Sequence, residues 1–379
     1  MARTTQRSIN RRILKELARI PTAPFAEHRV IEFVRRFCRS RRGVTLRTDA
    51  VGNMLARVRK GTRRVAKPVC ITAHLDHPGF VAEKMTSKTR LRAKWRGGVP
   101  PEYFVGSPVR FFFENTSVRG RVRSVKTVTK GGRKVVDTAA VDVSGQVPSG
   151  SMGVWDLPAP RVKGARFHAP VCDDFAGVAA MLGAIDELSK STRACDAYFL
   201  FTRAEEVGFA GAMAACRLKT IPQKCLVIAM ETSSELPHAK MGDGPILRVG
   251  DRATTYFSAA TAHCQHVADD LVKSDKRFKV QRRLMDGGMC EASAYCIFGY
   301  EATGMCLALG NYHNCDKKRT KIAHEYIDLT DYDNVIKWFV ALARTRRTYT
   351  GRDDALQKRL RGIETEYDAL LHASSDRPH

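Results

Sequence analysis

The stretch FLFTRAEEVG, residues 199–208, joins a short apolar run directly to two adjacent carboxylates. The apolar run has the length and composition of a buried strand, and the residues from Val207 onward are typical of a helix start. Glu205 and Glu206 leave the strand end in different directions, so both can reach one site from different angles. One carboxylate can bind a metal ion while the other moves protons. The stretch therefore predicts an active site at a strand end, provided that the chain supplies partners for it.

Other apolar segments also end beside residues that can bind metal. Four such strand ends occur: Val69–Ala73 before His74, Tyr198–Phe201 before Glu205 and Glu206, Cys225–Met230 before Glu231, and Met305–Leu309 before His313. Since the 379 residues include 39 acids and 11 histidines, a single case can arise by chance. Sites in open α/β sheets lie at the carboxyl ends of the strands, so the four ends together favour one shared site.

A pair of aspartates, Asp173 and Asp174, directly precedes an apolar segment with helical spacing, Phe175–Leu188. In isolation the pair indicates helix N-capping and compensation of the helix dipole. Beside the four strand ends, we expect one aspartate to bind metal while the other caps the helix.

The alternation of strands and helices predicts an α/β fold with a mostly parallel sheet covered by helices on both faces. From about Phe80 to Pro160 helical periodicity disappears and short alternating segments indicate a β-rich unit. We therefore expect a catalytic α/β domain over 1–79 and 161–345, an inserted domain over 80–160, and a charged helical tail over 346–379. The tail carries apolar residues at alternating four-three spacing, and over only two heptads this favours a helix that packs on the body over an independent coiled coil: Leu356, Leu360, Ile363, Tyr367 and Leu370.

Composition narrows the class of protein. No apolar run is long enough to span a membrane. The basic first fifteen residues also suit a transit peptide, but their helical spacing runs directly into the body and favours a structural helix. Eleven scattered cysteines suit a reducing, cytoplasmic environment. The net charge of +25 is consistent with a solvated basic surface or with an anionic partner such as nucleic acid.

Five motifs together resemble a known family. In order they are AHLDHPGF at 73–80, VCDDFAGVAA at 171–180, AEEVG at 204–208, METSS at 230–234 and NYHN at 311–314. This series is similar to the tetrahedral aminopeptidase family of co-catalytic zinc metallopeptidases, which includes glutamyl aminopeptidases and endoglucanase-named relatives. The resemblance extends from about Leu17 to Phe339 and implies a zinc-exopeptidase fold whose inserted domain mediates dimerisation.

The resemblance implies two divalent metal ions, zinc first and cobalt or manganese as alternatives, that share one bridging carboxylate. Asp173 is the implied bridge; His74 and Glu231 complete the first metal site, and Glu206 and His313 the second. Glu205 is the implied general base. Asp76 is implied to fix the imidazole of His74.

Further residues carry weaker expectations. His77 stands where the relatives usually have Glu, and it either faces the site or does not. The glycines Gly287 and Gly288 before Glu291 either let backbone approach a substrate or make a simple turn. Four histidines are expected to be structural or ordinary surface or core residues: His168, His263, His266 and His324.

Three functions follow from these observations. The first is a metal-dependent aminopeptidase that acts on peptides, works as a homo-oligomer between dimer and dodecamer, and draws acidic peptides to its basic surface. The second keeps the metal site but hydrolyses small acylated amino acids or other amides. The third is a non-catalytic assembly protein whose basic surface binds nucleic acid.

Overall fold

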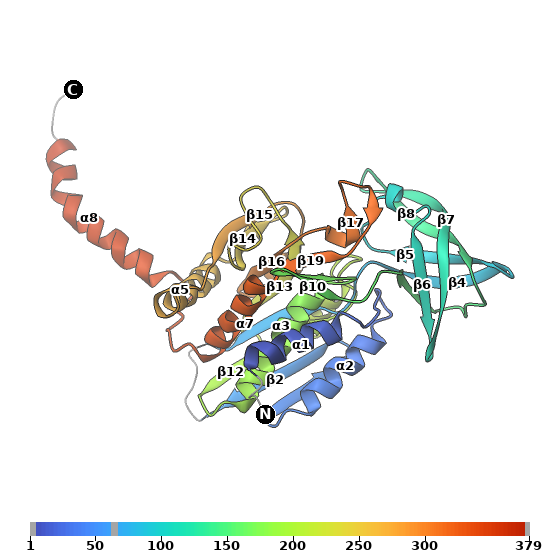
Figure 1. The fold of residues 1–379 in the computed structure, drawn as a ribbon. Coiled ribbons are helices and arrows are strands. Elements are labelled where there is room, and N and C mark those ends of the chain that lie inside the picture. The colour runs from blue at the N-terminus through green and yellow to red at the C-terminus, as the bar shows by residue number, and fades with distance from the viewer. Residues whose placement is uncertain (1–4, 62–66, 376–379) are drawn as a thin grey trace.

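A computed structural model describes residues 5–61 and 67–375, and the body of the protein is built on an eight-stranded sheet (Figure 1). Four neighbouring strands in the middle of the sheet, β12, β3, β13 and β16, are parallel, while β1, β2 and β14 pair antiparallel with their inner neighbours. This confirms the predicted mostly parallel sheet. Its strands in spatial order are β1 (Val44–Thr48), β2 (Met54–Lys60), β12 (Cys195–Thr202), β3 (Val69–His74), β13 (Leu226–Ser234), β16 (Ala302–Leu309), β14 (Ile246–Asp251) and β15 (Gln281–Met285).

Helices cover both faces of this sheet, as predicted, because the central strands are apolar on both sides. The larger apolar core packs five helices against one face: α1 (Gln6–Leu17), α2 (His28–Arg39), α3 (Phe175–Lys190), α5 (Ser258–Ser274) and α7 (Leu329–Arg344). The other face is covered by α4 (Ala210–Arg217) and α6 (Glu291–Ile297). The start of α4 differs from the prediction at Val207, because residues 205–209 form a turn that ends with Phe209 at a left-handed φ of 57°.

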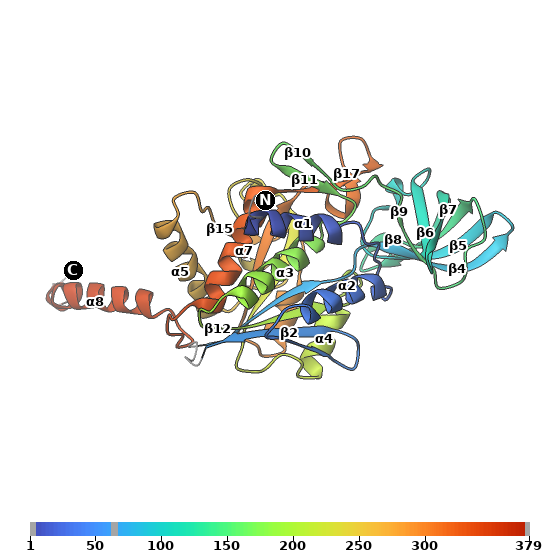
Figure 2. The ribbon, with the colours of Figure 1, turned by 60° about the horizontal axis from the view of Figure 1, so that its bottom comes forward.

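A closed six-stranded barrel leaves the sheet after β3 and lies to one side of the body (Figures 1 and 2). Its aromatic core centres on Phe80, whose ring lies 4.6 Å from that of Trp95 and 5.1 Å from that of Trp155. The barrel spans Gly79–Trp155, close to the residues expected for the insertion, and its role in dimerisation stays a prediction. Its elements are β4 (Gly79–Ser87), β5 (Arg90–Arg96), η1 (Pro101–Tyr103), β6 (Pro108–Phe113), β7 (Thr116–Lys130), β8 (Arg133–Val143) and β9 (Met152–Trp155).

Short strands join the barrel region to the body. A three-stranded sheet combines two strands before α3 with one before α7, and a two-stranded sheet follows the short helix η2 (Tyr312–Asn314). These strands are β10 (Arg161–Lys163), β11 (Arg166–Ala169), β19 (Glu325–Asp328), β17 (Cys315–Asp316) and β18 (Lys321–Ile322).

The C-terminal helix α8 (Asp354–Ser375) extends away from the body (Figures 1 and 2). The expectation that it packs on the body is wrong, since none of its residues is buried. The neighbouring helices α5 and α7 already bury their apolar sides in the main core. The row of apolar residues that the sequence places along α8 therefore faces solvent. Across the described residues, no helix combines the length and apolar character that a membrane crossing requires.

Candidate metal centre

The predicted metal-binding residues meet at one edge of the sheet, at the carboxyl ends of four neighbouring parallel strands. His74 ends β3, Glu231 lies near the end of β13, and the turn with Glu206 follows β12. His313 lies in η2, four residues beyond β16, and Asp173 approaches from the segment before α3. Parallel packing of apolar strands therefore brings together residues that are separated by up to 239 positions in the chain, because each strand exposes its first polar residues at this edge.

Asp173 lies between two pairs of possible ligands. Its Oδ1 is 3.3 Å from Nε2 of His74, and the same imidazole nitrogen is 3.4 Å from Oε1 of Glu231. Its Oδ2 is 3.7 Å from Nε2 of His313, which is 3.1 Å from Oε2 of Glu206. Each carboxylate oxygen of Asp173 thus faces a different pair of one histidine and one glutamate.

Two triads of residues each place their ligand atoms within 4.8 Å of one another, and Asp173 belongs to both. One triad adds His74 and Glu206, and the other adds Asp174 and Glu231. Among the described residues, the buried atoms Oδ1 of Asp173, Oε1 of Glu206 and Nε2 of His313 have no hydrogen-bond partner. Buried polar atoms are normally paired, so unpaired ligand atoms in these two neighbouring groups fit bound cations.

Charge is concentrated in this cluster. Burial, followed by the charge of Glu231, raises the pKa of Asp173 well above its usual range. Burial alone would lower the pKa of His74, but Glu205, Asp173 and the other nearby carboxylates raise it well above its ordinary value. Burial opposes ionisation of Glu231 as well, yet the hydrogen bond and charge of His74 lower its pKa to about 2. Several carboxylates that share one buried space repel one another, and divalent cations would relieve that repulsion.

Asp174 has a different set of contacts from Asp173. Its Oδ1 accepts hydrogen bonds from the backbone N–H of Gly177 at 3.1 Å and from Oγ1 of Thr232 at 2.7 Å. It is the N-cap residue of α3, which agrees with the expectation that one aspartate of the pair caps the helix. Its Oδ2 remains buried without a hydrogen bond, so one oxygen still points toward the cluster.

The carboxylate of Asp76 holds the turn that carries the two adjacent glutamates. Its Oδ1 accepts the N–H of Glu205 at 2.9 Å, and its Oδ2 accepts the N–H of Glu206 at 3.1 Å. The Nδ1 of His74 lies 3.7 Å from this carboxylate but 3.1 Å from the backbone oxygen of Asp76. The hydrogen bond that orients the imidazole is therefore made by the carbonyl of Asp76, whereas the sequence pointed to its carboxylate.

Two buried glutamates that the sequence did not single out hold the same turn and the Asp173 segment. Glu27 accepts the N–H of Ala204 at 3.1 Å and pairs with Arg203 at 2.8 Å, at a position where Ala204 has a left-handed φ of 52°. Glu325 in β19 accepts the N–H groups of Cys172 at 2.7 Å and Asp173 at 3.0 Å. Neither glutamate belongs to a local motif, so only their tertiary contacts reveal them.

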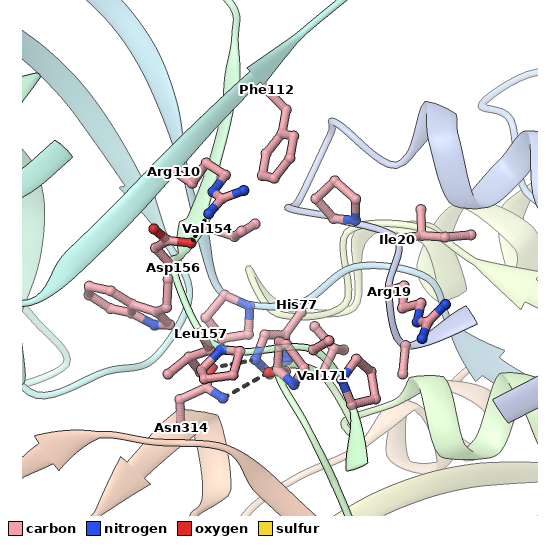
Figure 3. Close-up of a pocket in the computed structure, with 18 of the residues that line it drawn as sticks. Arg19, Ile20, His77, Arg110, Phe112, Val154, Asp156, Leu157, Val171 and Asn314 are labelled. Atoms are coloured by element: carbon pink, nitrogen blue, oxygen red, sulfur yellow. Dashed lines mark hydrogen bonds and ion pairs between the residues drawn. The ribbon is translucent and has the colours of Figure 1, made fainter. Parts of the chain in front are cut away.

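His77 lies at the edge of the cluster, with its Nδ1 3.9 Å from Oε1 of Glu206. Its Nδ1 is 2.7 Å from the backbone oxygen of Asp173, and its Nε2 is 3.0 Å from Oδ1 of Asn314. Figure 3 shows this contact with Asn314 at one end of a cavity of about 530 Å³, which is also lined by Phe112, Asp156 and other residues of the barrel side. His77 therefore lines this second cavity and also contacts the backbone of Asp173 beside the cluster.

A small cavity of about 80 Å³ opens beside the ligands, with Glu205 in its wall. Gly287 and Gly288 line it, so the approach of their backbone to a substrate stays a prediction. Arg248 also lines it; its guanidinium is buried and donates to Oγ of Ser233 at 3.1 Å. The rest of the wall consists of Asp173, Glu206, Glu231, Ser233, Ser234, Leu236, Met285, Met289 and Tyr312.

The remaining histidines lie outside both triads of the described residues. His168 in β11 lies beside the ring of Tyr326 with centroids 5.1 Å apart, and His324 contacts the backbone oxygen of Pro158 at 2.8 Å. His263 is buried in α5, and His266 contacts Asp353 at 3.7 Å.

Glu291 is buried at the start of α6, where burial raises its pKa to about 7, and Oγ1 of Thr72 donates to it at 3.3 Å.

Curated relatives are similar to this chain in sequence, and solved structures share its fold. Lysyl aminopeptidase from Pyrococcus furiosus is 28% identical over 54% of this chain and 63% of its own length. A putative aminopeptidase from Acetivibrio thermocellus is 24% identical over 55% of this chain, so the alignment spans just under two thirds of either relative. The Pyrococcus horikoshii TET1 peptidase superposes with a TM-score of 0.71 at 21% identity, over 88% of this chain and 99% of its own. Aminopeptidase APDkam598 from Desulfurococcus kamchatkensis gives 0.73 at 20% identity, over 90% and 96%.

These likenesses agree with the motifs in the sequence. The sequence profile of the M42 glutamyl aminopeptidases matches residues 52–337, which is well over half of the chain and includes the strand ends, the aspartate pair and the barrel. The resemblance inferred from the five motifs is thereby confirmed, and the chain belongs to the M42 glutamyl aminopeptidase family.

Proposed function

We propose that this protein is a two-metal aminopeptidase that hydrolyses N-terminal residues from peptides. The observation that carries the proposal is the position of Asp173, whose two carboxylate oxygens face separate histidine–glutamate pairs at 3.3 and 3.7 Å. A carboxylate that reaches two ligand sets can bridge two cations. Membership of the M42 family supports the same class of reaction.

The ligand sets assign the metals as follows. In this proposal His74 and Glu231 would hold one ion, Glu206 and His313 would hold the other, and Asp173 would serve both. Two imidazoles among carboxylates suit a borderline cation such as zinc, with cobalt or manganese as alternatives. When bound, such ions polarise a peptide carbonyl and lower the pKa of a bound water toward neutrality.

Glu205 acts as the general base in this proposal. It lies in the wall of the cavity, adjacent to the ligand Glu206, and its backbone N–H is held by Asp76 at 2.9 Å. Its carboxylate takes a proton from the attacking water and returns it to the leaving amine. Asp76 is the positioning residue, because its two oxygens hold the N–H groups of both glutamates.

The dimensions of the site favour a chain end. The cavity beside the ligands measures about 80 Å³, which suits one small side chain better than the middle of a peptide. The test compares a short free-amine peptide with its N-acetylated form, using metal-stripped protein to which zinc is returned. Zinc-dependent cleavage of the free-amine peptide supports the proposal. Cleavage confined to N-acyl substrates would favour a deacylase, and salt-sensitive binding of nucleic acid without hydrolysis would favour a binding protein.

A basic groove adjoins the metal cavity and suits acidic peptides. The groove measures about 510 Å³ and shares Ser234 and Tyr312 with the metal cavity. Its basic side chains are Arg161, Lys163, Arg166, Lys317, Lys318 and Arg319. We propose that acidic residues beyond the scissile bond lie in it.

The groove proposal is tested with peptides that differ only in charge. At low salt, kcat/KM should be higher for peptides with downstream Glu than for those with downstream Lys, and Lys317→Glu with Lys318→Glu should reverse the order. Lys130→Glu, at the far end of β7 in the barrel, is the matched control. Equal kcat/KM values for acidic and basic peptides would remove the proposal.

Assembly and location complete the proposal. We propose a homo-oligomer, between dimer and dodecamer, because TET1 peptidase from Pyrococcus horikoshii is described as assembling into a tetrahedron or an octahedral shell. Light scattering on the purified protein measures this directly.

A cytoplasmic location is proposed because all eleven cysteines are free and ten are buried.

A further inference from the structure

The C-terminal helix α8 has an apolar seam that the body does not cover. Five residues repeat at four-three spacing along one side and are 43 to 63% exposed: Leu356, Leu360, Ile363, Tyr367 and Leu370. Such a seam is typical of a helix that packs against another helix, and the 14 residues from first to last extend over about 21 Å. The seam is too short to dimerise strongly by itself, but it can act where copies are already held close together.

The charges of α8 are divided between its two halves. After Asp354 at its first position, the helix carries the cations Lys358, Arg359 and Arg361 before Ile363 and the anions Glu364, Glu366 and Asp368 after it. Two copies in parallel would place like charges side by side along the whole seam. Two antiparallel copies would place the basic half of each beside the acidic half of the other.

The seam is close to symmetric about Ile363, which suits an antiparallel pair centred on that residue. With Ile363 opposite its own copy, Leu356 lies opposite Leu370, and Leu360 lies one position from the residue opposite Tyr367. The same register places Lys358 opposite Asp368. In this register the apolar residues of the two seams meet, and the basic residues of each helix lie beside the acidic residues of the other.

The root of α8 agrees with this geometry. The preceding segment is fixed to α5 by Arg347, whose guanidinium donates twice to Asp270 at 2.7 Å. From there the helix extends away from the body in both views (Figures 1 and 2). In an antiparallel pair the two bodies lie at opposite ends of the helices, where they do not collide.

We infer that α8 is a self-association element that pairs antiparallel with α8 of a second copy of this chain, in the register centred on Ile363. It would join copies, or assembled oligomers, without involving the metal centre. The inference does not depend on the proposed peptidase activity, and its test uses no activity measurement.

Charge reversal in the full-length protein tests the pairing. One variant makes residues 358–368 wholly acidic (Lys358→Glu, Arg359→Glu, Arg361→Glu), and another makes the same residues wholly basic (Glu364→Lys, Glu366→Lys, Asp368→Lys). Both substitutions keep good helix formers, so the helix itself should persist. The reference is a chain that stops after residue 352. Sedimentation velocity should show that each variant alone has lost the association seen in the wild type. Its sedimentation coefficients should then indicate no more association than those of the truncated chain.

Two recombinations make the charge test specific. An equal mixture of the acidic and basic variants should associate again, and a chain with both sets of reversals should associate like the wild type. Association that survives a single reversal, or that fails to return in the mixture, would overturn the inference. Tighter binding of nucleic acid by the basic variant without self-association would assign the helix to a different partner and would also overturn it.

Cysteine cross-linking tests the register. Leu356→Cys and Leu370→Cys proteins, when mixed and mildly oxidised, should form the mixed disulfide and little of either homodisulfide. The antiparallel register brings these two positions together, whereas the two copies of either one lie about 21 Å apart. A dominant 356–356 homodisulfide would indicate parallel pairing and would refute the register.

Discussion

Replacing Glu205 with Gln should abolish most turnover while it leaves the metals in place. The amide keeps the volume of the side chain, and Asp76 still accepts the backbone N–H at 2.9 Å, so the turn should not move. Loss of a general base costs about 10²- to 10⁴-fold in rate, or about 3 to 5 kcal/mol of barrier. Burial raises the pKa of Glu205 well above its usual range; the charge of His74 lowers it, and the charges of Glu231 and Glu206 raise it further. Because the site disfavours a charge on this residue, a neutral amide should not destabilise the metal-free protein.

The assay pairs kcat/KM on a free-amine peptide with elemental analysis of the same sample. The matched comparison is Glu206→Gln, one residue away, which should lose both activity and metal because it removes a ligand. Glu102→Gln, in the barrel helix η1, should change neither. A Glu205→Gln protein that hydrolyses peptides at the wild-type rate, or that loses as much metal as Glu206→Gln, would refute the assignment of Glu205 as the base.

Three further predictions concern the supporting structure. Asp173→Asn should reduce metal binding at both sites, whereas Asp174→Asn should retain both metals because Asn also caps helices; equal metal loss would make Asp174 a ligand. Gly177→Ala should lower the free energy of unfolding by about 2 to 3 kcal/mol, because the added Cβ would meet the Asp174 carboxylate, and unchanged denaturant stability would argue against this cap. Burial, with nearby charges that include His266, lowers the pKa of His263 to about 4. The unfolded chain therefore binds this proton first as the pH falls, and the free energy of unfolding should decrease by about 2 kcal/mol from pH 7 to pH 5. His263→Gln should remove this pH dependence, and a pH dependence that persists in the variant would contradict the prediction.

Much of the fold and the cluster could be predicted because the relevant signals are local. Each central strand is a short, mainly apolar run with polar residues at or just beyond its carboxyl end, and parallel packing places those ends at one edge. His74, Glu231 and the Glu205–Glu206 pair are all of this type. The capping role of Asp174 follows from the same kind of local pattern, since it stands directly before a helix.

The remaining features depend on tertiary contacts that no local pattern encodes. Glu27 accepts the N–H of Ala204, 177 residues away, and Glu325 accepts the N–H of Asp173, 152 residues away. Nothing in the sequence around either glutamate distinguishes it from a surface glutamate. Asp76 lies where a carboxylate can reach either the imidazole of His74 or the turn of Glu205, and the packed turn determines which. For α8 the seam was visible in the sequence, but whether the body leaves an apolar surface for it depends on how α5 and α7 pack.

The most direct test of the central claim is a titration of metal-stripped protein with zinc, in which bound metal and peptide hydrolysis are measured on the same samples. The geometry around Asp173 predicts that binding saturates at about two ions per chain. Full turnover of a free-amine peptide should appear only as the second site fills. Saturation at one ion per chain with full turnover, or hydrolysis that is unchanged in the stripped protein, would contradict a two-metal peptidase.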